Sequence, residues 1–302
     1  MKFGICLPIR LDADAGANVR IAKRAEELGY DSVWASDHVV IPEKRAGMFT
    51  DEFHDPFMLL SSIAAGTSRI IVGTSVIILP YRNPLVTAKM AATLDVLSGG
   101  RLVFGVGPGW MREEFEALGV PFGSRGRMTD EYIKVIRELW RSERPEFHGE
   151  FVDFSNVGFY PKPVQTPGPP VWAAGASRHA VRRAALLGDG WQPTAVSPGD
   201  VRAGMGELMR IAAEAGRGLD GFTFSLRNRL RFSDDAEAPK PGIGAPAFTL
   251  TGSVSRVRDY VAGYIEGGVS HILFDPDAGD LDEYYSIMET AAEEIMPGFR
   301  AD

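Results

Sequence analysis

The regular alternation of short apolar runs with amphipathic stretches is the feature that most constrains the fold of this chain. Each run is rich in β-branched or other apolar residues, and each following stretch repeats its apolar residues at helical spacing. Eight such pairs follow one another, which predicts parallel strands joined by helices. The predicted strands cover residues 3–8, 31–36, 70–79, 102–107, 171–174, 190–194, 222–232 and 271–275.

The stretches between these runs carry helix start and stop signals. Asn83 followed by Pro84 is typical of an N-cap and a first helical residue, and Gly99 with Gly100 marks the end of that helix. The predicted helices cover residues 17–29, 55–67, 84–98, 111–118, 128–141, 178–187, 199–216, 254–267 and 282–295.

Eight strand–helix units in 302 residues favour a single (β/α)8 TIM barrel, which typically takes about 250 residues. A doubly wound open sheet produces a similar alternation and remains the alternative. We expect one domain spanning residues 1–302. The barrel would leave enough chain for several long loops.

Long insertions are expected after strands two, four and seven, at residues 40–54, 110–127 and 233–249. A further segment, 145–170, precedes strand five and contains a possible hairpin at 147–154. Loops that follow barrel strands lie on the face that carries active sites, so these insertions are candidate lids or pocket walls. The alternative is that some are surface loops without function.

Composition excludes several classes of function. Lys and Arg number 32 against 40 Asp and Glu, and the formal charge of −8 lacks the basic field that nucleic-acid binding needs. The longest apolar run, 70–80, is far shorter than the ~20 residues of a membrane span, and the apolar stretch within residues 1–10 is shorter than we expect of a signal peptide. Cys6 is the one cysteine, so no internal disulfide can form. We therefore expect a cytoplasmic protein without nucleic-acid or membrane partners.

Ser36-Asp37-His38, at the expected carboxyl end of strand two, is the first candidate for chemistry. Histidine is suited to moving protons near neutral pH, and a carboxylate can orient a site. Neighbours on a strand point to opposite sides, so Asp37 and His38 need not touch, and such a pair is also common as a structural feature. His271 begins its strand, which indicates a structural role on the opposite face of the barrel. The five histidines form no close metal-ligand pair, so no metal site is predicted.

Three glycine-containing segments also end predicted strands. Glycine there permits a bulge or the close approach of a flat ligand, although each segment is also compatible with ordinary packing. The third segment opens a helix, where free N–H groups and a Ser hydroxyl can bind an anion, with Arg178 adding charge and the next strand completing the wall. The segments are Gly73-Thr74-Ser75-Val76, Gly105-Val106-Gly107-Pro108-Gly109-Trp110 and Gly175-Ala176-Ser177, with Gly190-Trp191 on the next strand.

Taken in order, these motifs resemble the luciferase-like monooxygenase superfamily, and most closely its branch that uses the deazaflavin coenzyme F420. The matching segments are S-D-H, G-T-S-V with N-P beyond it, R-L-V-F-G-V-G-P-G-W, and A-A-G-A-S before G-D-G-W. The resemblance covers residues 1–140 closely and 171–275 more loosely.

The resemblance implies a TIM barrel with the coenzyme ring over the strand ends, and a homodimer acting on a small-molecule substrate. It implies a non-prolyl cis peptide at Ser75-Val76 that supports the ring. It also places Asp37 near the ring. The remaining coenzyme-binding positions that it implies are Gly107, Pro108, Gly109 and Trp110 along the ring edge, Gly175, Ala176 and Ser177 around the phosphate, and Gly190 with Trp191 beside them.

Two departures from the family pattern bear on function. Trp110 stands where some deazaflavin-dependent sugar dehydrogenases carry a catalytic Glu, which argues against a sugar phosphate. Pro108 stands where bacterial luciferase has an Arg, which favours F420 over FMN. We therefore expect hydride transfer with two catalytic residues, His38 as general acid or base and Asp37 to position the ring or the substrate. An FMN-dependent monooxygenase is the alternative.

Two further hypotheses come from other classes. One is a coenzyme-free hydrolase using Glu113, Glu114 and Asp275, although Glu113 and Glu114 are expected to face solvent early in a helix. The other is a flavin-binding protein without turnover. Phe49, Trp110 and Met111 are expected to form an apolar wall of the substrate pocket.

Overall fold

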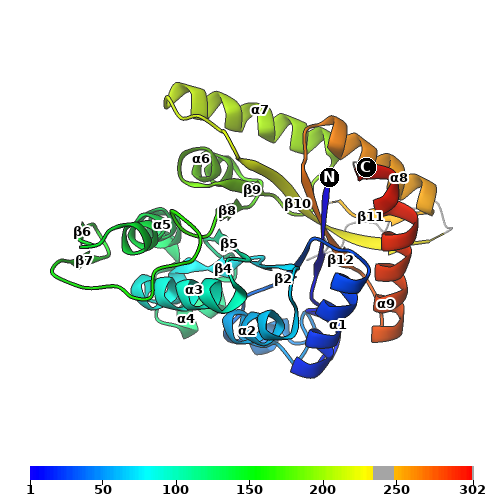
Figure 1. The fold of residues 1–302 in the computed structure, drawn as a ribbon, viewed down its shortest axis with the longest axis horizontal. Helices are drawn as coiled ribbons and strands as arrows, with labels where there is room; N and C mark the ends of the chain where they lie inside the picture. The colour runs from blue at the N-terminus through cyan, green and yellow to red at the C-terminus, as the bar shows by residue number, and fades with distance from the viewer. Residues whose placement is uncertain (234–247, 301–302) are drawn as a thin grey trace.

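The chain folds into a closed barrel of eight parallel strands, as the computed structural model of residues 1–233 and 248–300 shows (Figure 1). The first and last barrel strands pair with each other, and β9 pairs with β10, so the sheet closes on itself. The predicted TIM barrel is confirmed, and an open sheet is excluded. The barrel strands are β1 (Lys2–Cys6), β2 (Ser32–Ala35), β3 (Ile71–Thr74), β5 (Leu102–Gly107), β8 (Val171–Ala174), β9 (Gly190–Gln192), β10 (Thr223–Phe232) and β12 (His271–Pro276).

Helices connect the strands and cover the outside of the barrel (Figure 1). Asn83 caps α3 as predicted, because its side chain accepts from the N–H of Leu85 at 2.9 Å, and Gly99 ends the helix at φ 66°. None of the helices in the two described ranges has the length and hydropathy of a membrane span. The helices are α1 (Ala15–Glu27), α2 (Pro56–Gly66), α3 (Pro84–Ser98), α4 (Arg112–Ala117), α5 (Arg125–Arg141), α6 (Arg178–Leu187), α7 (Pro198–Glu214), α8 (Val254–Glu266) and α9 (Leu281–Thr290).

The third predicted strand is broken in two. Its first half is β3, and its second is β4 (Ile77–Ile78), which pairs only with β5. The break lies at a cis peptide bond between Ser75 and Val76. A continuous run of apolar and β-branched residues does not reveal such a break, so the predicted strand was too long.

Two smaller elements complete the sheets. The expected hairpin is present as β6 (Phe147–His148) and β7 (Asp153–Phe154). A short strand that the sequence did not predict, β11 (Leu250–Gly252), pairs with the end of β10. The insertion predicted at 233–249 lies largely outside the described residues.

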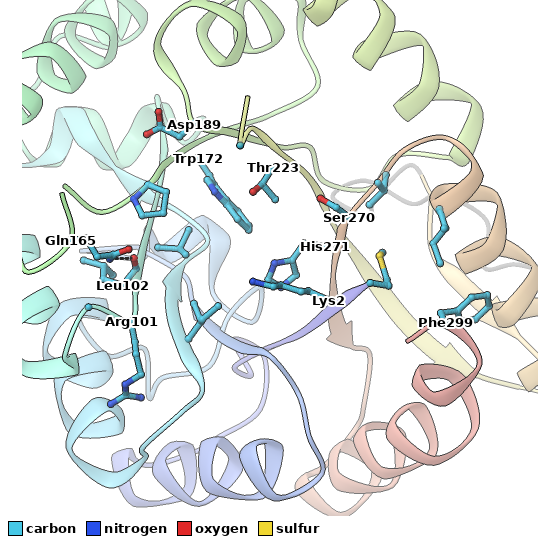
Figure 2. Close-up of a pocket in the computed structure, with 18 residues that line it drawn as sticks. Lys2, Arg101, Leu102, Gln165, Trp172, Asp189, Thr223, Ser270, His271 and Phe299 are labelled. Atoms are coloured by element: carbon cyan, nitrogen blue, oxygen red, sulfur yellow. Dashed lines mark hydrogen bonds between the residues drawn. The ribbon is translucent and has the colours of Figure 1, made fainter. Parts of the chain in front are cut away.

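The amino-terminal end of the barrel is closed by aromatic packing and holds a cavity of about 660 Å³. Trp34 and Trp172 stack there with ring centroids 5.0 Å apart, and His271 meets both rings edge-on. Figure 2 shows Trp172 and His271 at this cavity. His271 is buried, and its Nε2 lies 2.8 Å from Oγ of Ser32. Burial lowers the pKa of His271 to about 3, so the ring is neutral. Its expected structural position at the start of a strand is confirmed.

Candidate active site

A second cavity, of about 1060 Å³, opens at the carboxyl ends of the barrel strands. This is the face on which barrel enzymes place their catalytic groups. Loops after β1, β2, β5 and β8 and the break between β3 and β4 all contribute to its wall. Among the predicted site residues, those that line it are Asp37, His38, Ser75, Val76, Gly107, Pro108, Gly109, Trp110, Gly175 and Ser177.

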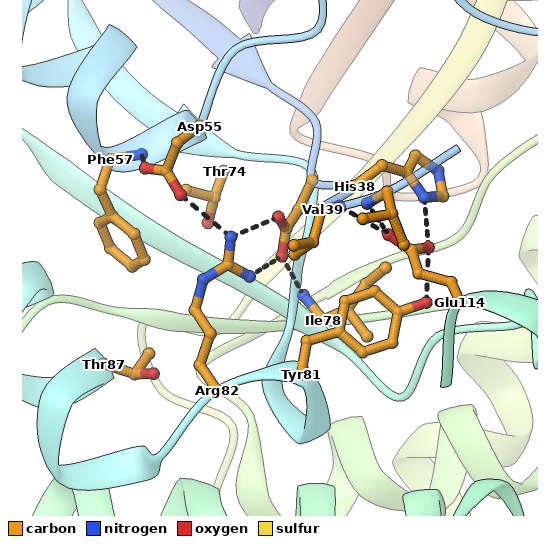
Figure 3. A network of polar contacts seen from close by, with 12 residues as sticks. His38, Val39, Asp55, Phe57, Thr74, Ile78, Tyr81, Arg82, Thr87 and Glu114 are labelled. Carbon is orange, nitrogen blue, oxygen red and sulfur yellow. Dashed lines mark hydrogen bonds and ion pairs between the residues drawn. The ribbon is translucent and has the colours of Figure 1, made fainter. Parts of the chain in front are cut away.

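His38 is held by a buried carboxylate at the edge of this cavity. Its Nδ1 lies 2.8 Å from Oε2 of Glu114, and the His38 side chain is 8% exposed (Figure 3). An ionised carboxylate only accepts hydrogen bonds, so this contact assigns the proton to Nδ1. The other nitrogen, Nε2, has no hydrogen-bond partner among the described residues and belongs to a side chain that lines the cavity. A neutral His38 therefore presents a proton acceptor to a bound molecule.

Glu114 is fully buried, which corrects the expectation that it faces solvent. Besides His38, it accepts from the N–H of Val39 at 2.6 Å and from the hydroxyl of Tyr81 at 2.7 Å. Burial opposes ionisation, but the hydrogen bonds from His38, Val39 and Tyr81 together hold the pKa of Glu114 below its usual value. The carboxylate is thus a fixed anchor for the imidazole.

Asp37, which was expected to position the ring or the substrate, is itself held by neighbouring groups of the protein. Arg82 donates to both carboxylate oxygens, at 2.5 and 2.8 Å, and the N–H of Ile78 donates to one of them at 2.9 Å. The Asp37 side chain has no exposed surface, and Arg82 also contacts Asp55, the N-cap of α2 (Figure 3). With its oxygens occupied, Asp37 fixes the backbone around the cavity and does not touch His38.

The sequence analysis missed Arg227 as a site residue. This buried guanidinium on β10 donates to Asp275 at 2.9 and 3.1 Å, to Oγ of Ser36 at 2.8 Å and to the carbonyl of Ser75 at 2.8 Å. It thereby ties three strands to the cis peptide at the cavity floor. Asp275 is consequently paired within the wall and is not free for the role that the hydrolase hypothesis gives it. The sequence did offer one indication, because Arg227 is a charged residue in the middle of a predicted strand and such a residue needs a buried partner or a ligand.

Glu113 is also engaged. Its carboxylate pairs with Lys44 at 2.6 Å and with Arg45 at 3.7 Å. The three carboxylates of the hydrolase hypothesis are therefore each held by cationic or imidazole side chains of their own.

The glycines of β5 and the turn after it allow close packing as well as the approach of a ligand. A Cβ on Gly105 would lie 1.9 Å from the carbonyl oxygen of Thr74, and one on Gly107 would lie 2.9 Å from Val76. Gly109 has φ +76°, and a Cβ there would meet Ile78 at 2.7 Å. These glycines allow β5 and its turn to pack directly on the cis peptide and β4.

The turn between β8 and α6 forms the far side of the cavity. Gly175 has φ +105°, and Ser177 caps α6 by accepting from the N–H of Ala180 at 3.2 Å. The first N–H groups of any helix lack intrahelical acceptors and attract anions. This turn therefore offers an anion site at the cavity wall, although Ala176 is not among the lining residues.

Gly190 and Trp191 lie behind the wall, which corrects their expected contact with a ligand. Trp191 is 1% exposed, and its indole N–H donates to the carbonyl of Gly175 at 2.8 Å. A Cβ on Gly190 would lie 2.5 Å from Trp172, so this glycine is required by packing. Both residues shape the turn indirectly.

Aromatic side chains surround the imidazole. The ring of Phe49 lies 4.5 Å from that of His38, and Trp110 meets His38 edge-on at 6.3 Å. Trp110 is 51% exposed and lies under the guanidinium of Arg45 at 5.5 Å. Met111 is fully buried in the core, so it is not part of the apolar wall as expected. Phe49 and Trp110 supply that wall.

The chain has relatives with two kinds of coenzyme. An uncharacterised protein of Mycobacterium tuberculosis is 33% identical over 279 residues, which is 88% of this chain and 96% of that protein. The F420-dependent glucose-6-phosphate dehydrogenase of Amycolatopsis mediterranei is 37% identical over 57% of this chain and 51% of that enzyme. The FMNH(2)-dependent dimethylsulfone monooxygenase of Pseudomonas putida is 28% identical over 70% of this chain and 57% of that enzyme.

Solved structures share the fold along the whole chain. The monooxygenase RslO1 of Streptomyces bottropensis superposes with a TM-score of 0.83 at 23% identity, covering 99% of this chain and 100% of that one. An F420-dependent secondary alcohol dehydrogenase has the same TM-score of 0.83 at 20% identity, covering 99% of both chains. The model of the family described as luciferase-like monooxygenase matches residues 1–240, and the chain therefore belongs to this family of flavin- and deazaflavin-dependent oxidoreductases.

Proposed function

We propose that this protein binds coenzyme F420 at the carboxyl end of the barrel and transfers a hydride between it and a small organic substrate. The observation that carries the proposal is His38, whose Nδ1 is fixed by Glu114 while Nε2 is left free at the edge of the cavity. A proton acceptor beside a coenzyme cavity suits the oxidation of an alcohol, which loses a hydride and a proton. Reduction of an activated double bond uses the same residue in the opposite direction.

The lining residues fit an extended, phosphorylated coenzyme. The Ser75-Val76 peptide and the turn of Gly107 and Gly109 would contact the ring, and the start of α6 at Ser177 would hold the phosphate. Gly175 has a positive φ, and a Cβ there would lie 3.1 Å from Cβ of Ala180, so a glycine suits this tight turn into α6. When bound, the deazaflavin supplies the hydride donor or acceptor.

The part played by the chain is placement and proton transfer. In alcohol oxidation, Nε2 of His38 accepts the hydroxyl proton, and Glu114 stabilises the imidazolium that results. In the reductive direction, the protonated ring returns that proton. Phe49 and Trp110 restrict the access of water to the imidazole. Arg227 holds the carbonyl of Ser75 and so fixes the floor on which the ring would rest.

An FMN-dependent monooxygenase is the second candidate, supported by the FMNH(2)-dependent relative. The choice of F420 is supported by Pro108, which lines the cavity and offers neither a backbone N–H nor a charged side chain to a phosphate. The two candidates differ in oxygen consumption, because reduced flavin reacts with oxygen and the reduced deazaflavin scarcely does.

Turnover measured with both coenzymes tests the proposal. We expect oxidation of an alcohol or reduction of an enone with F420 under anaerobic conditions, and we expect His38→Ala to lose at least about 100-fold in turnover while keeping its coenzyme affinity. The matched control is His148→Ala, which is exposed on the hairpin strand β6 and does not line the cavity. A loss of tenfold or less in His38→Ala contradicts the role of His38, and oxygen consumption with FMN alone favours the second candidate.

A further inference from the structure

We propose that the substrate carries a carboxylate and that Arg10 binds it. The inference rests on the proposed function, since it identifies the substrate class of that same site. The chain has a formal charge of −8, yet most of the charged side chains that line the cavity are cationic. These lining residues are the cationic Arg10, Lys44, Arg45, Arg227 and Arg229 and the anionic Asp37 and Asp275.

Most of these charges are already paired. Arg227 forms an ion pair with Asp275 at 2.9 Å, and Arg229 forms one with Asp277 at 3.4 Å. Lys44 and Arg45 both pair with Glu113. Arg10 has no ion pair or hydrogen bond with the described residues, although it lines the cavity. An uncompensated guanidinium facing a cavity is positioned to receive an anionic group of a bound molecule.

The neighbours of Arg10 make the region suitable for a carboxylate. In the barrel, β1 and β10 flank β12 on its two sides, so Arg10, after β1, and Arg229, on β10, both lie near the end of β12. Partial removal from water lowers the pKa of Arg10. The nearby carboxylate of Asp275 raises this pKa, and the positive charge of Arg229 lowers it further. An arginine nevertheless remains charged near neutral pH, so two cations share this region with Asp277.

This region is separate from the anion site expected for the coenzyme. The strand order around the barrel is β1, β2, β3, β5, β8, β9, β10 and β12, which places β8 opposite β1. The start of α6 follows β8, whereas Arg10 follows β1. A coenzyme phosphate at Ser177 therefore leaves Arg10 for the substrate, with His38, which follows the neighbouring strand β2, available to the reacting hydroxyl.

Paired probes test this inference. Short aliphatic and aromatic monocarboxylates, each with its primary amide, are titrated into the coenzyme-loaded protein and followed by ligand-observed NMR and calorimetry. We expect at least one carboxylate to bind about tenfold or more tighter than its amide, because hydrogen bonds to charged groups are stronger than neutral ones. If every carboxylate binds no better than its amide, the inference is wrong.

Variants assign the effect to the residue. Arg10→Gln should lose about tenfold or more of the carboxylate affinity and none of the amide affinity, while Arg10→Lys should retain part of the preference through its charge. The control is Arg202→Gln, which removes the same charge from an exposed position on α7. Equal behaviour of the two Gln variants overturns the assignment.

Coenzyme affinity separates this inference from the proposed function. Arg10→Gln should bind F420 as wild type does, and a matching loss of F420 affinity would assign Arg10 to an anionic part of the coenzyme and refute its substrate role. If wild type binds neither F420 nor FMN, the proposed function fails. The carboxylate and amide titrations then still decide the role of Arg10 on the protein alone.

Discussion

Replacing Glu114 with Gln tests how the imidazole is held. The carboxylate accepts from His38 at 2.8 Å, Tyr81 at 2.7 Å, and the N–H groups of Val39 and Val40 at 2.6 and 3.2 Å. Glutamine has one oxygen and one NH2 group, so it cannot accept all four. In the first case the NH2 group of glutamine faces the N–H groups of Val39 and Val40. In the second case it faces the side chains of His38 and Tyr81, so the ring must reverse its tautomer and carry its proton on Nε2.

The structure sets the size of the effect. Two donors lose their acceptor, and each unsatisfied group costs about 1–3 kcal/mol, so we expect the free energy of unfolding to fall by about 2–6 kcal/mol. In the second case turnover should also fall by about 100-fold or more, because a ring protonated on Nε2 no longer accepts the substrate proton. Urea unfolding and steady-state kinetics measure the two effects, with exposed Glu116→Gln on the same helix as the control.

The pH dependence adds a second readout. The pKa of Glu114 is lower in the folded protein than in the unfolded chain, so its stabilisation is present above the usual value of about 4.3 and is lost as the pH falls through the folded value. The difference in stability between wild type and Glu114→Gln should therefore be largest near pH 7 and shrink in acid. A difference below about 0.5 kcal/mol, as for a surface substitution, would refute the reasoning.

Three further predictions concern other parts of the molecule. Ser177→Asp should weaken coenzyme binding about fivefold or more, because like charges repel by ~1 kcal/mol at 4 Å even in water; unchanged affinity in a fluorescence titration moves the phosphate elsewhere. Gly109→Ala should cost about 1–3 kcal/mol of unfolding free energy, since its φ is +76° and its Cβ would meet Ile78 at 2.7 Å and Phe115 at 2.9 Å; wild-type urea stability would contradict this. His271 is neutral in the fold down to about pH 3, so the unfolded chain gains a proton below about 6.5 and wild type should lose up to about 1.4 kcal/mol per pH unit there. His271→Gln should show a shallower loss in acid, and identical slopes would show that the buried ring does not carry this dependence.

The barrel was predictable because hydrophobic period and helix caps are local properties. Leu102–Gly107 and Val171–Ala174 have the bounds that their apolar runs predicted, and Asn83 caps the helix that it was expected to begin. The apolar run 70–79 does not reveal the break at Ser75-Val76. Only the family resemblance implied a cis peptide at this bond, and the structure confirms it. The homodimer, which also came from the resemblance, stays a prediction.

The polar contacts around the site were less predictable, because they join residues far apart in sequence. His38 was identified from its strand end, but its partner Glu114 lies 76 residues away and was expected in solvent. Asp37 was given a catalytic role because nothing in the sequence shows that Arg82 occupies both of its oxygens. Trp191 was placed in the wall because a strand pattern does not tell which aromatic side chain faces outward.

Coenzyme binding to the purified protein tests the central claim most directly, because it needs no knowledge of the substrate. The protein is titrated separately with F420 and with FMN, and ligand fluorescence is followed. We expect micromolar or tighter binding of F420 and much weaker binding of FMN. Preferential binding of FMN would contradict the hydride-transfer proposal in favour of a monooxygenase, and binding of neither would contradict the assignment of the cavity as a coenzyme site.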